Sequence, residues 1–311
     1  DATILVVAKG GMVNAAGTAA NPIVFTAFDA VANPEVQGKW GGIVLLGTAP
    51  IGEEGNNEKI EGIQGGATVT WNYYGGTDAN DNSGTLQYVS IRHGGAIIAE
   101  GNELNGLTLG GVGAGTTIEN IEIISNSDDG LECFGGNVDV TNLLVYNQGD
   151  DAVDIDMSYD GTIDNVMIIQ EPAGDHAMEI DGPKAGADVN KPFTLTNVTV
   201  IGNTANTKNA IADFRDGANG TVSNLLAYNL SASSNVELDK AADVTRFNDG
   251  ELTFTSWEVV VPDGATLAGI FDNKVDDTSF ENGFATAISS SDSATVGATN
   301  NFGWSYYGQQ N

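Results

Sequence analysis

Acidic residues alternate with apolar residues in two stretches near the middle of the chain, where paired carboxylates could bind a metal ion. The stretch Asn147–Asp156 reads NQGDDAVDID and places Asp154 and Asp156 two positions apart. A later stretch, MEID, repeats this spacing with Glu179 and Asp181. Alternate residues of a β-strand point to the same face of a sheet. If the two stretches form neighbouring strands, their four carboxylates make a square on one sheet face.

Four carboxylates at this spacing repel one another strongly unless a cation lies among them. Ca²⁺ accepts six to eight oxygen ligands in irregular geometry. We therefore predict that Ca²⁺ binds to Asp154, Asp156, Glu179 and Asp181, and a solvated acidic face is the alternative. Glu132, at the equivalent position of the preceding repeat, is a further candidate ligand.

Another candidate calcium site lies in the segment DANDNSG. Asp78, Asn80 and Asn82 occupy alternate positions, as in a calcium-binding loop, but Gly84 comes one place late and the terminal Glu is absent. An Asx-rich turn, in which these side chains bond backbone amides, fits the same residues.

The same region could instead act on an acidic polysaccharide, as a calcium-dependent lyase or a glycoside hydrolase. A hydrolase needs a proton-donating carboxylate and a group that activates water, whereas a lyase needs a base that removes a carbon-bound proton. The candidate catalytic residues in this alternative are Asp151, Asp154, Asp156, His176, Glu179 and Arg215. The chain has no GHG motif and no Arg-x-Lys pair, so we assign no catalytic residue.

An internal repeat indicates the elements that position these side chains. The segments 117–134 and 140–156 align with a spacing of 22 residues, which places Asn120 over Asn142 and Leu131 over Val153. Each unit alternates apolar residues over a few positions and is then broken by Gly, Asn or Asp, as expected for short strands and tight turns. Such a period predicts an all-β, right-handed parallel β-helix with about 22–33 residues per coil. The recurrent Asn predicts a ladder of side-chain amides between coils.

The repeat alignment also predicts which residues follow one another on the outer sheet face. The first column is Glu132, Asp154, Glu179, Ala212 and Glu237, and the second is Phe134, Asp156, Asp181, Phe214 and Asp239.

The chain is predicted to form a single domain over residues 1–311. Residues 51–83 form an inserted loop, 84–262 the regular coils and 263–311 a less regular C-terminal cap. The inserted loop carries Trp71, Tyr73 and Tyr74, whose rings could stack on sugars or pack on the flank of the β-helix.

The composition limits the classes of partner. The chain has 42 acidic and 11 basic residues and a formal net charge of -31, which disfavours nucleic acid and anionic membranes and favours divalent cations. One cysteine and two histidines exclude an internal disulfide and a cysteine-cluster zinc site. No stretch approaches the roughly 20 apolar residues of a transmembrane helix.

Several runs resemble a known family. They are ATILVVAKGG, KWGGIVLLGTAPI, YGGTDANDNSGTLQYVSIRHGG, SDDGLECFGG and VYNQGDDAVDID. They look like secreted β-helix surface proteins of unassigned function from Bacteroidota and marine Proteobacteria, over about residues 2 to 260. The resemblance implies the β-helix fold and an extracellular or outer-surface location, and it implies no catalytic residues.

These observations together predict a structural or adhesive protein of the cell exterior with a calcium-binding acidic flank. Its expected partners are acidic or neutral polysaccharide. Because the first strand begins at Thr3 without an amphipathic cap, we also expect that another copy could cover this end. Such head-to-tail contact would generate a filament.

Overall fold

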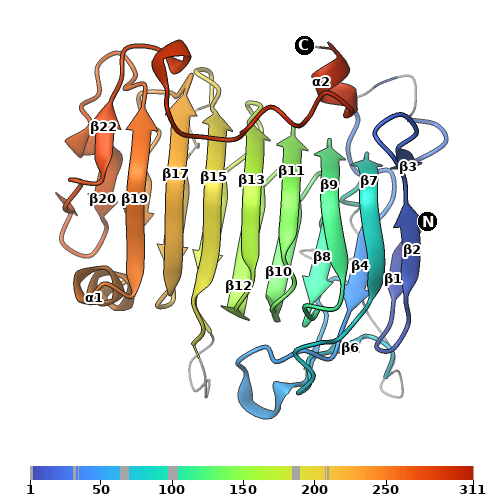
Figure 1. The fold of residues 1–311 in the computed structure, drawn as a ribbon. Coiled ribbons are helices and arrows are strands. Elements are labelled where there is room, and N and C mark those ends of the chain that lie inside the picture. Colours follow the sequence, from blue (N-terminus) through green and yellow to red (C-terminus); the bar gives the residue numbers. More distant parts are fainter. Residues whose placement is uncertain are drawn as a thin grey trace.

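The computed structural model describes residues 3–30, 33, 35–63, 70–96, 104–183, 190–206, 208 and 210–310. Their strands build two long sheets that face each other across a common core along a solenoid (Figure 1). Sheet A consists of β1 (Leu5–Val7), β4 (Ile43–Leu46), β8 (Leu107–Gly110), β10 (Leu131–Gly136), β12 (Val153–Tyr159), β14 (Met178–Asp181), β16 (Ala212–Arg215), β18 (Val236–Leu238), β20 (Phe271–Asn273) and β21 (Thr278–Ser279). Sheet B consists of β2 (Val13–Ala16), β3 (Ile23–Phe25), β7 (Gly84–Arg92), β9 (Thr117–Ile124), β11 (Val140–Tyr146), β13 (Thr162–Ile169), β15 (Phe193–Ile201), β17 (Gly220–Tyr228), β19 (Leu252–Val259) and β22 (Ala285–Ala287).

The chain alternates between the two sheets, so each coil adds one parallel strand to each of them. Leu131 pairs with Val153 and Val153 with Met178, which are the predicted repeat positions. The inward side chains of both sheets form one continuous apolar core, in which residues such as Leu143 and Ile180 are completely buried. The predicted right-handed parallel β-helix is confirmed.

A column of asparagines bends the strands of sheet B. Asn120, Asn142 and Asn165 have φ angles of 57°, 59° and 62°, a left-handed conformation that Asn tolerates better than most residues. The Asn142 amide donates to Asn120 Oδ1 at 3.0 Å, and the Asn165 amide donates to Asn142 Oδ1 at 2.6 Å. Each amide thus links one coil to the next, as the repeat predicted.

The described part of the inserted segment folds over the outer face of sheet A. It contains the short helix η1 (Glu54–Asn56) and an antiparallel pair of strands, β5 (Glu58–Lys59) and β6 (Tyr73–Tyr74). Tyr74 is 1% exposed and its ring lies 5.7 Å from that of Phe134 on β10. A second hydrophobic cluster therefore lies between the insertion and sheet A.

The C-terminal region both extends the sheets and runs back along one of them. Helix α1 (Ala241–Asp249) interrupts the last regular coils, and β20 and β22 continue both sheets beyond residue 263. Two short helices, η2 (Ala268–Ile270) and η3 (Ser291–Ser293), lie in this region. Residues 295–310, which end in α2 (Tyr306–Gln310), then cross sheet B from β19 toward β7 (Figure 1). This C-terminal strap bonds successive coils, because Thr299 N donates to Asn165 Oδ1 and Tyr307 N donates to Glu122 Oε1.

Candidate functional site

The outer face of sheet A gathers carboxylates from successive coils, as the alternation predicted. Glu132 on β10 pairs with Asp154 on β12, and Asp154 pairs with Glu179 on β14. The sheet spacing of about 4.8 Å brings such neighbours close together. The face therefore carries a column of acids.

The predicted register is wrong by one residue at β16. Ala212 pairs with Val236, so Asp213 lies opposite Glu179 and Arg215 lies opposite Asp181. A slip of one residue exchanges the two faces of a strand. The outward residues of β16 are thus Asp213 and Arg215 rather than the predicted Ala212 and Phe214. Packing decides the register, because Phe214 is completely buried and its ring lies 4.9 Å from that of Phe254.

Arg215 neutralises one end of the predicted carboxylate square. Its Nε donates to Asp181 Oδ1 at 2.7 Å, and its Nη2 donates to Asp181 Oδ2 at 3.2 Å and also contacts Glu179. Burial opposes the guanidinium charge, but the hydrogen bond and charge of Asp181 outweigh it and raise the pKa of Arg215. The charged guanidinium thus compensates the carboxylates of Asp181 and Glu179.

His176 forms a second charge-paired group on the turn beside this face. Its Nδ1 lies 2.8 Å from Asp151 Oδ1 and 3.4 Å from Glu179 Oε2. Burial would lower the pKa of His176, but the Asp151 hydrogen bond and the surrounding carboxylates raise it to about 9. Burial, followed by the charge of Asp151, raises the pKa of Glu179 to about 8. The neighbouring carboxylates therefore favour the imidazolium form of His176. Ligand atoms of His176, Asp151 and Glu179 also lie within 4.8 Å of one another, as a metal site would require.

Lys274 forms a third charge-paired group at the C-terminal end of the face. Its Nζ lies 2.7 Å from Glu237 Oε1 and 3.0 Å from Asp272 Oδ2. Glu237 and Asp272 are direct neighbours in the register of β18 and β20. The ammonium thus compensates the next pair of stacked acids.

A fourth group, which we call the acidic trio, consists of Asp129, Glu132 and Asp154. One carboxylate oxygen from each lies within 4.8 Å of the others. Asp129 is 7% and Glu132 is 4% exposed. Burial and the mutual repulsion of the carboxylates raise the pKa of all three residues well above their ordinary values. Among the described residues, no ion pair involves a member of the trio.

Asn105 and the Asp151 backbone donate hydrogen bonds to members of the acidic trio. The Asn105 amide nitrogen donates to Glu132, and the oxygen of the same amide is buried without a hydrogen-bond partner in the described part of the chain. Asp129 Oδ1 accepts a hydrogen bond from the Asp151 amide at 3.0 Å, and Asp151 Oδ1 accepts one from the His176 amide at 2.7 Å. The same contact thus recurs in successive turns and explains the repeated Asp-Asp in SDDG and GDDA.

The predicted square does not form one cluster. Asp154 belongs to the acidic trio, Glu179 contacts His176 and Arg215, and Asp181 pairs with Arg215. Asp156 lies opposite Phe134 in the strand register. The structure therefore moves the candidate cation site toward β10, where it includes Glu132. Sequence reasoning missed Asn105 as a neighbour and Asp129 as a candidate ligand.

In the insertion, the predicted calcium ligands Asp78 and Asn82 accept hydrogen bonds from backbone amides. Asp78 Oδ1 accepts from the Asn80 amide at 3.0 Å and Asn82 Oδ1 accepts from the Gly84 amide at 2.8 Å, so both side chains form Asx turns.

The three aromatic residues of the insertion differ in their exposure. Tyr74 is buried against Phe134, so of the two predicted alternatives it packs on the flank of the β-helix and is not available to stack on a sugar. Tyr73 lies under Lys59, whose Nζ is 5.4 Å from the ring centre. Trp71 is 46% exposed and could contact a ligand.

Comparison with known proteins identifies a family over nearly the whole chain. A family model described as a pectate-lyase-like β-helix domain matches residues 1–306. No curated protein and no solved structure matches the chain. In the described residues, no helix is long and apolar enough to cross a membrane.

Proposed function

Because the chain belongs to the family of pectate-lyase-like β-helix domains, we propose that it contacts polysaccharide through a calcium site on the outer face of sheet A. The acidic trio holds the ion, and the role of the protein is structural or adhesive. Its location is the cell exterior, in keeping with the resemblance to secreted surface proteins. The observation that carries this proposal is the convergence of three largely buried carboxylates that no described basic group neutralises.

The electrostatics of the trio favour a divalent cation. The raised pKa values of Asp129, Glu132 and Asp154 mean that their charged forms are disfavoured in the folded protein. A bound Ca²⁺ would offset this cost, and the Asn105 amide oxygen is a ligand type that Ca²⁺ accepts.

The ion also gives the acidic face a means of contacting an anionic chain. With a net charge of -31, the protein repels polyanions at long range. Ca²⁺ takes six to eight oxygen ligands, more than three monodentate carboxylates and one amide provide. The remaining positions can accept carboxylate or hydroxyl oxygens of a polysaccharide, so the ion acts as the bridge.

Calorimetric titration of chelator-treated protein with Ca²⁺ tests the proposal. We expect saturable binding that is at least tenfold weaker in the double variant Glu132→Gln/Asp154→Asn. A matched control, Asp276→Asn/Asp277→Asn, removes the same charge from an exposed loop and should bind as the wild type does. Equal binding by all three proteins would contradict the proposal, provided that circular dichroism shows each to be folded.

The second step is to measure binding to pectate and alginate with and without Ca²⁺. Retention on either polymer only in the presence of Ca²⁺ supports the adhesive role. Release of unsaturated uronate or of reducing ends would instead support the enzymatic alternative.

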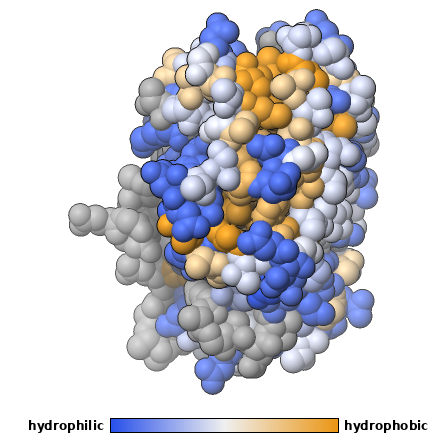
Figure 2. Space-filling model, turned by 90° about the vertical axis from the view of Figure 1, so that its left-hand side faces the viewer, coloured by the Kyte–Doolittle hydropathy of each residue, from blue (hydrophilic) through white to orange (hydrophobic). Residues whose placement is uncertain are grey.

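Head-to-tail assembly is a second proposal, favoured by the C-terminal end of the solenoid. Figure 2 shows a band of apolar residues on this end. Val261, Leu267 and Phe284, which follow β19 in the chain, are partly buried against the core. Among the described strands, β22 forms the outer edge of sheet B, and such edges can pair with another strand. Sedimentation velocity should show oligomers that grow with concentration and are reduced by Val275→Asp, a substitution at a 47% exposed position in the β20–β21 hairpin. Monomers at every concentration would exclude the assembly.

A further inference from the structure

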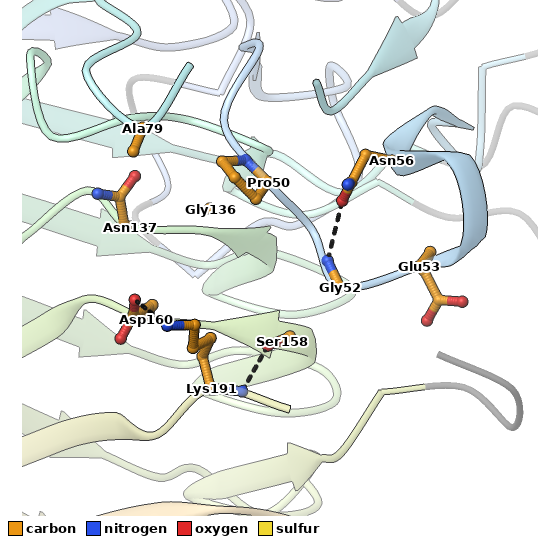
Figure 3. Close-up of a pocket in the computed structure, with 10 residues that line it drawn as sticks. All are labelled: Pro50, Gly52, Glu53, Asn56, Ala79, Gly136, Asn137, Ser158, Asp160 and Lys191. Atoms are coloured by element: carbon orange, nitrogen blue, oxygen red, sulfur yellow. Dashed lines mark hydrogen bonds and ion pairs between the residues drawn. The ribbon is translucent and has the colours of Figure 1, made fainter. Parts of the chain in front are cut away.

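A cavity of about 380 Å³ lies between the insertion and the ends of strands β10 and β12 (Figure 3). Its lining residues come from five parts of the chain: Pro50, Gly52, Glu53 and Asn56; Ala79; Gly136 and Asn137; Ser158 and Asp160; and Lys191. Its volume is at the lower end of the range of about 300–1,000 Å³ for small-molecule sites.

The cavity is separate from the acidic trio. On β10, Phe134 lies between Glu132 and Gly136, and on β12, Met157 lies between Asp154 and Ser158. Phe134 and Met157 both belong to the hydrophobic cluster beneath the insertion. A ligand in the cavity therefore needs no ion bound to the trio.

Hydrogen bonds hold the walls of the cavity in place. The Gly136 amide donates to the Pro50 carbonyl at 2.9 Å, and the Lys191 amide donates to Ser158 Oγ at 2.6 Å. Gly136 has a φ of 82°, and a Cβ at this position would lie 2.5 Å from the Val112 carbonyl oxygen. These contacts fix the segments around the ends of β10 and β12 relative to one another, and a preformed cavity loses less entropy when it binds a ligand.

The cavity offers several hydrogen-bond acceptors as well as donors. Asn137 Oδ1 is buried and has no partner among the described residues. The carboxylates of Glu53 and Asp160 add further acceptors, and Lys191 Nζ, 4.0 Å from Asp160 Oδ2, is a donor. Pro50 and Ala79 supply apolar surface. Hydroxyl groups of a ligand could donate to these acceptors while its C–H groups contact Pro50 and Ala79.

The charges and shapes of the lining exclude other ligand classes. Two carboxylates and one ammonium, in a chain of net charge -31, disfavour a phosphate or a uronate. None of the described lining residues is aromatic, so the cavity offers no stacking surface for a flat aromatic ligand. The remaining class with many hydroxyl donors and a small apolar surface is a neutral sugar.

We propose that this cavity binds one neutral hexose unit, free or within a polysaccharide, independently of calcium. This site goes beyond the calcium-dependent contact on sheet A, since its ligand is uncharged. The hydroxyl groups of the sugar donate to Asn137 Oδ1 and to the carboxylates, and Lys191 donates to a hydroxyl or ring oxygen.

Ligand-observed NMR in the presence of a chelator tests this site. The probes are the methyl glycosides of glucose, galactose and mannose, and the charged comparison is the methyl glycoside of galacturonic acid as its sodium salt. We expect saturable binding of at least one neutral glycoside and no binding of the uronate. Because calcium is absent, the outcome is independent of the proposal for the acidic trio.

Three variants and one control locate the binding. Ala79→Trp fills the cavity from an exposed position and should abolish binding without changing the melting temperature. Asn137→Ala removes the buried acceptor and should weaken binding about tenfold, which corresponds to about 1.4 kcal/mol. Lys191→Ala removes the ammonium group from the lining. Its matched control is Lys208→Ala, at an exposed position outside the lining, and this control should bind normally. The proposal is overturned if no neutral glycoside binds, if Ala79→Trp binds as the wild type does, or if the uronate binds more tightly than the neutral sugars.

Discussion

Replacement of Asp213 by asparagine should make the protein more stable at alkaline pH. Asp213 is 7% exposed, and its Oδ1 is buried without a hydrogen-bond partner among the described residues. It lies between Glu179 and Glu237 in the strand register. Burial and, after it, the charge of Glu237 raise the pKa of Asp213 from its ordinary value of 3.8 to about 7, despite the opposing charges of His176 and Arg215.

The magnitude follows from the two pKa values. The folded protein keeps this proton up to about pH 7, whereas the unfolded chain releases it near pH 3.8. As the pH rises from 3.8 to about 7, Asp213 therefore lowers the free energy of unfolding of the wild type. Below pH 3.8 Asp213 is protonated in both states and has no such effect. At about 1.4 kcal/mol for each tenfold change in proton affinity, the full loss is about 4 kcal/mol. The neutral amide of Asp213→Asn avoids this loss.

Denaturant unfolding from pH 4 to pH 8.5, in a chelating buffer, measures the effect. The difference in unfolding free energy between Asp213→Asn and the wild type should grow by up to about 4 kcal/mol across this range, with most of the change complete by pH 8. Asp249→Asn, at an exposed position on α1, is the matched control and should follow the wild type. Parallel curves for Asp213→Asn and the wild type would refute the reasoning.

Two further predictions concern the contacts between coils. Asn165→Ala should lower the free energy of unfolding by about 2–3 kcal/mol, because it loses hydrogen bonds to the neighbouring coil and the strap and places alanine at a φ of 62°. Asn165→Gly should recover about 1 kcal/mol of this loss, and equal stability of the two variants would argue against backbone strain. Glu122→Ala should loosen the C-terminal strap, because the buried Glu122 accepts from the Tyr307 amide at 2.9 Å and pairs with Arg92. Hydrogen exchange should then quicken in α2 and not in α1, and unchanged exchange in α2 would contradict the assigned contact.

The fold could be predicted because each coil repeats the same physical requirements. One residue per coil must adopt a left-handed conformation, and Asn meets this requirement at Asn120, Asn142 and Asn165. The apolar alternation around Leu131 and Val153 recurs at the same distance from that Asn. Two independent signals therefore agreed on the register of these coils.

The register at β16 could not be predicted by the same means. The run NAIADF has two small or apolar residues in succession, Ile211 and Ala212, and both are completely buried. Alternation alone does not choose between the two faces in such a run. The packing of Phe214 against Phe254 decides it, and this partner comes from a strand of the other sheet.

The sites depend on still more distant contacts. Alternation predicted that Asp154 lies on the outer face of sheet A, but Asn105 and Asp129 come from the turns that precede β8 and β10. The cavity is assembled from five separate segments, and no periodic pattern joins them. Periodicity therefore predicts the face on which a residue lies, whereas the composition of a site depends on loops whose course has no repeat.

The strongest argument for a cation at the acidic trio is a comparison within the same face. Coil stacking places acids beside acids along sheet A, and three basic side chains each compensate one such group: Arg215, His176 and Lys274. Each supplies a positive charge within 4 Å of two carboxylates. The acidic trio is built by the same stacking but has no such ion pair among the described residues. A fully solvated acidic surface does not describe the trio, because Asp129 and Glu132 are buried. We expect the trio to retain protons at neutral pH or to bind an external cation, and calcium titration at two pH values separates these states, since bound Ca²⁺ would release protons from it.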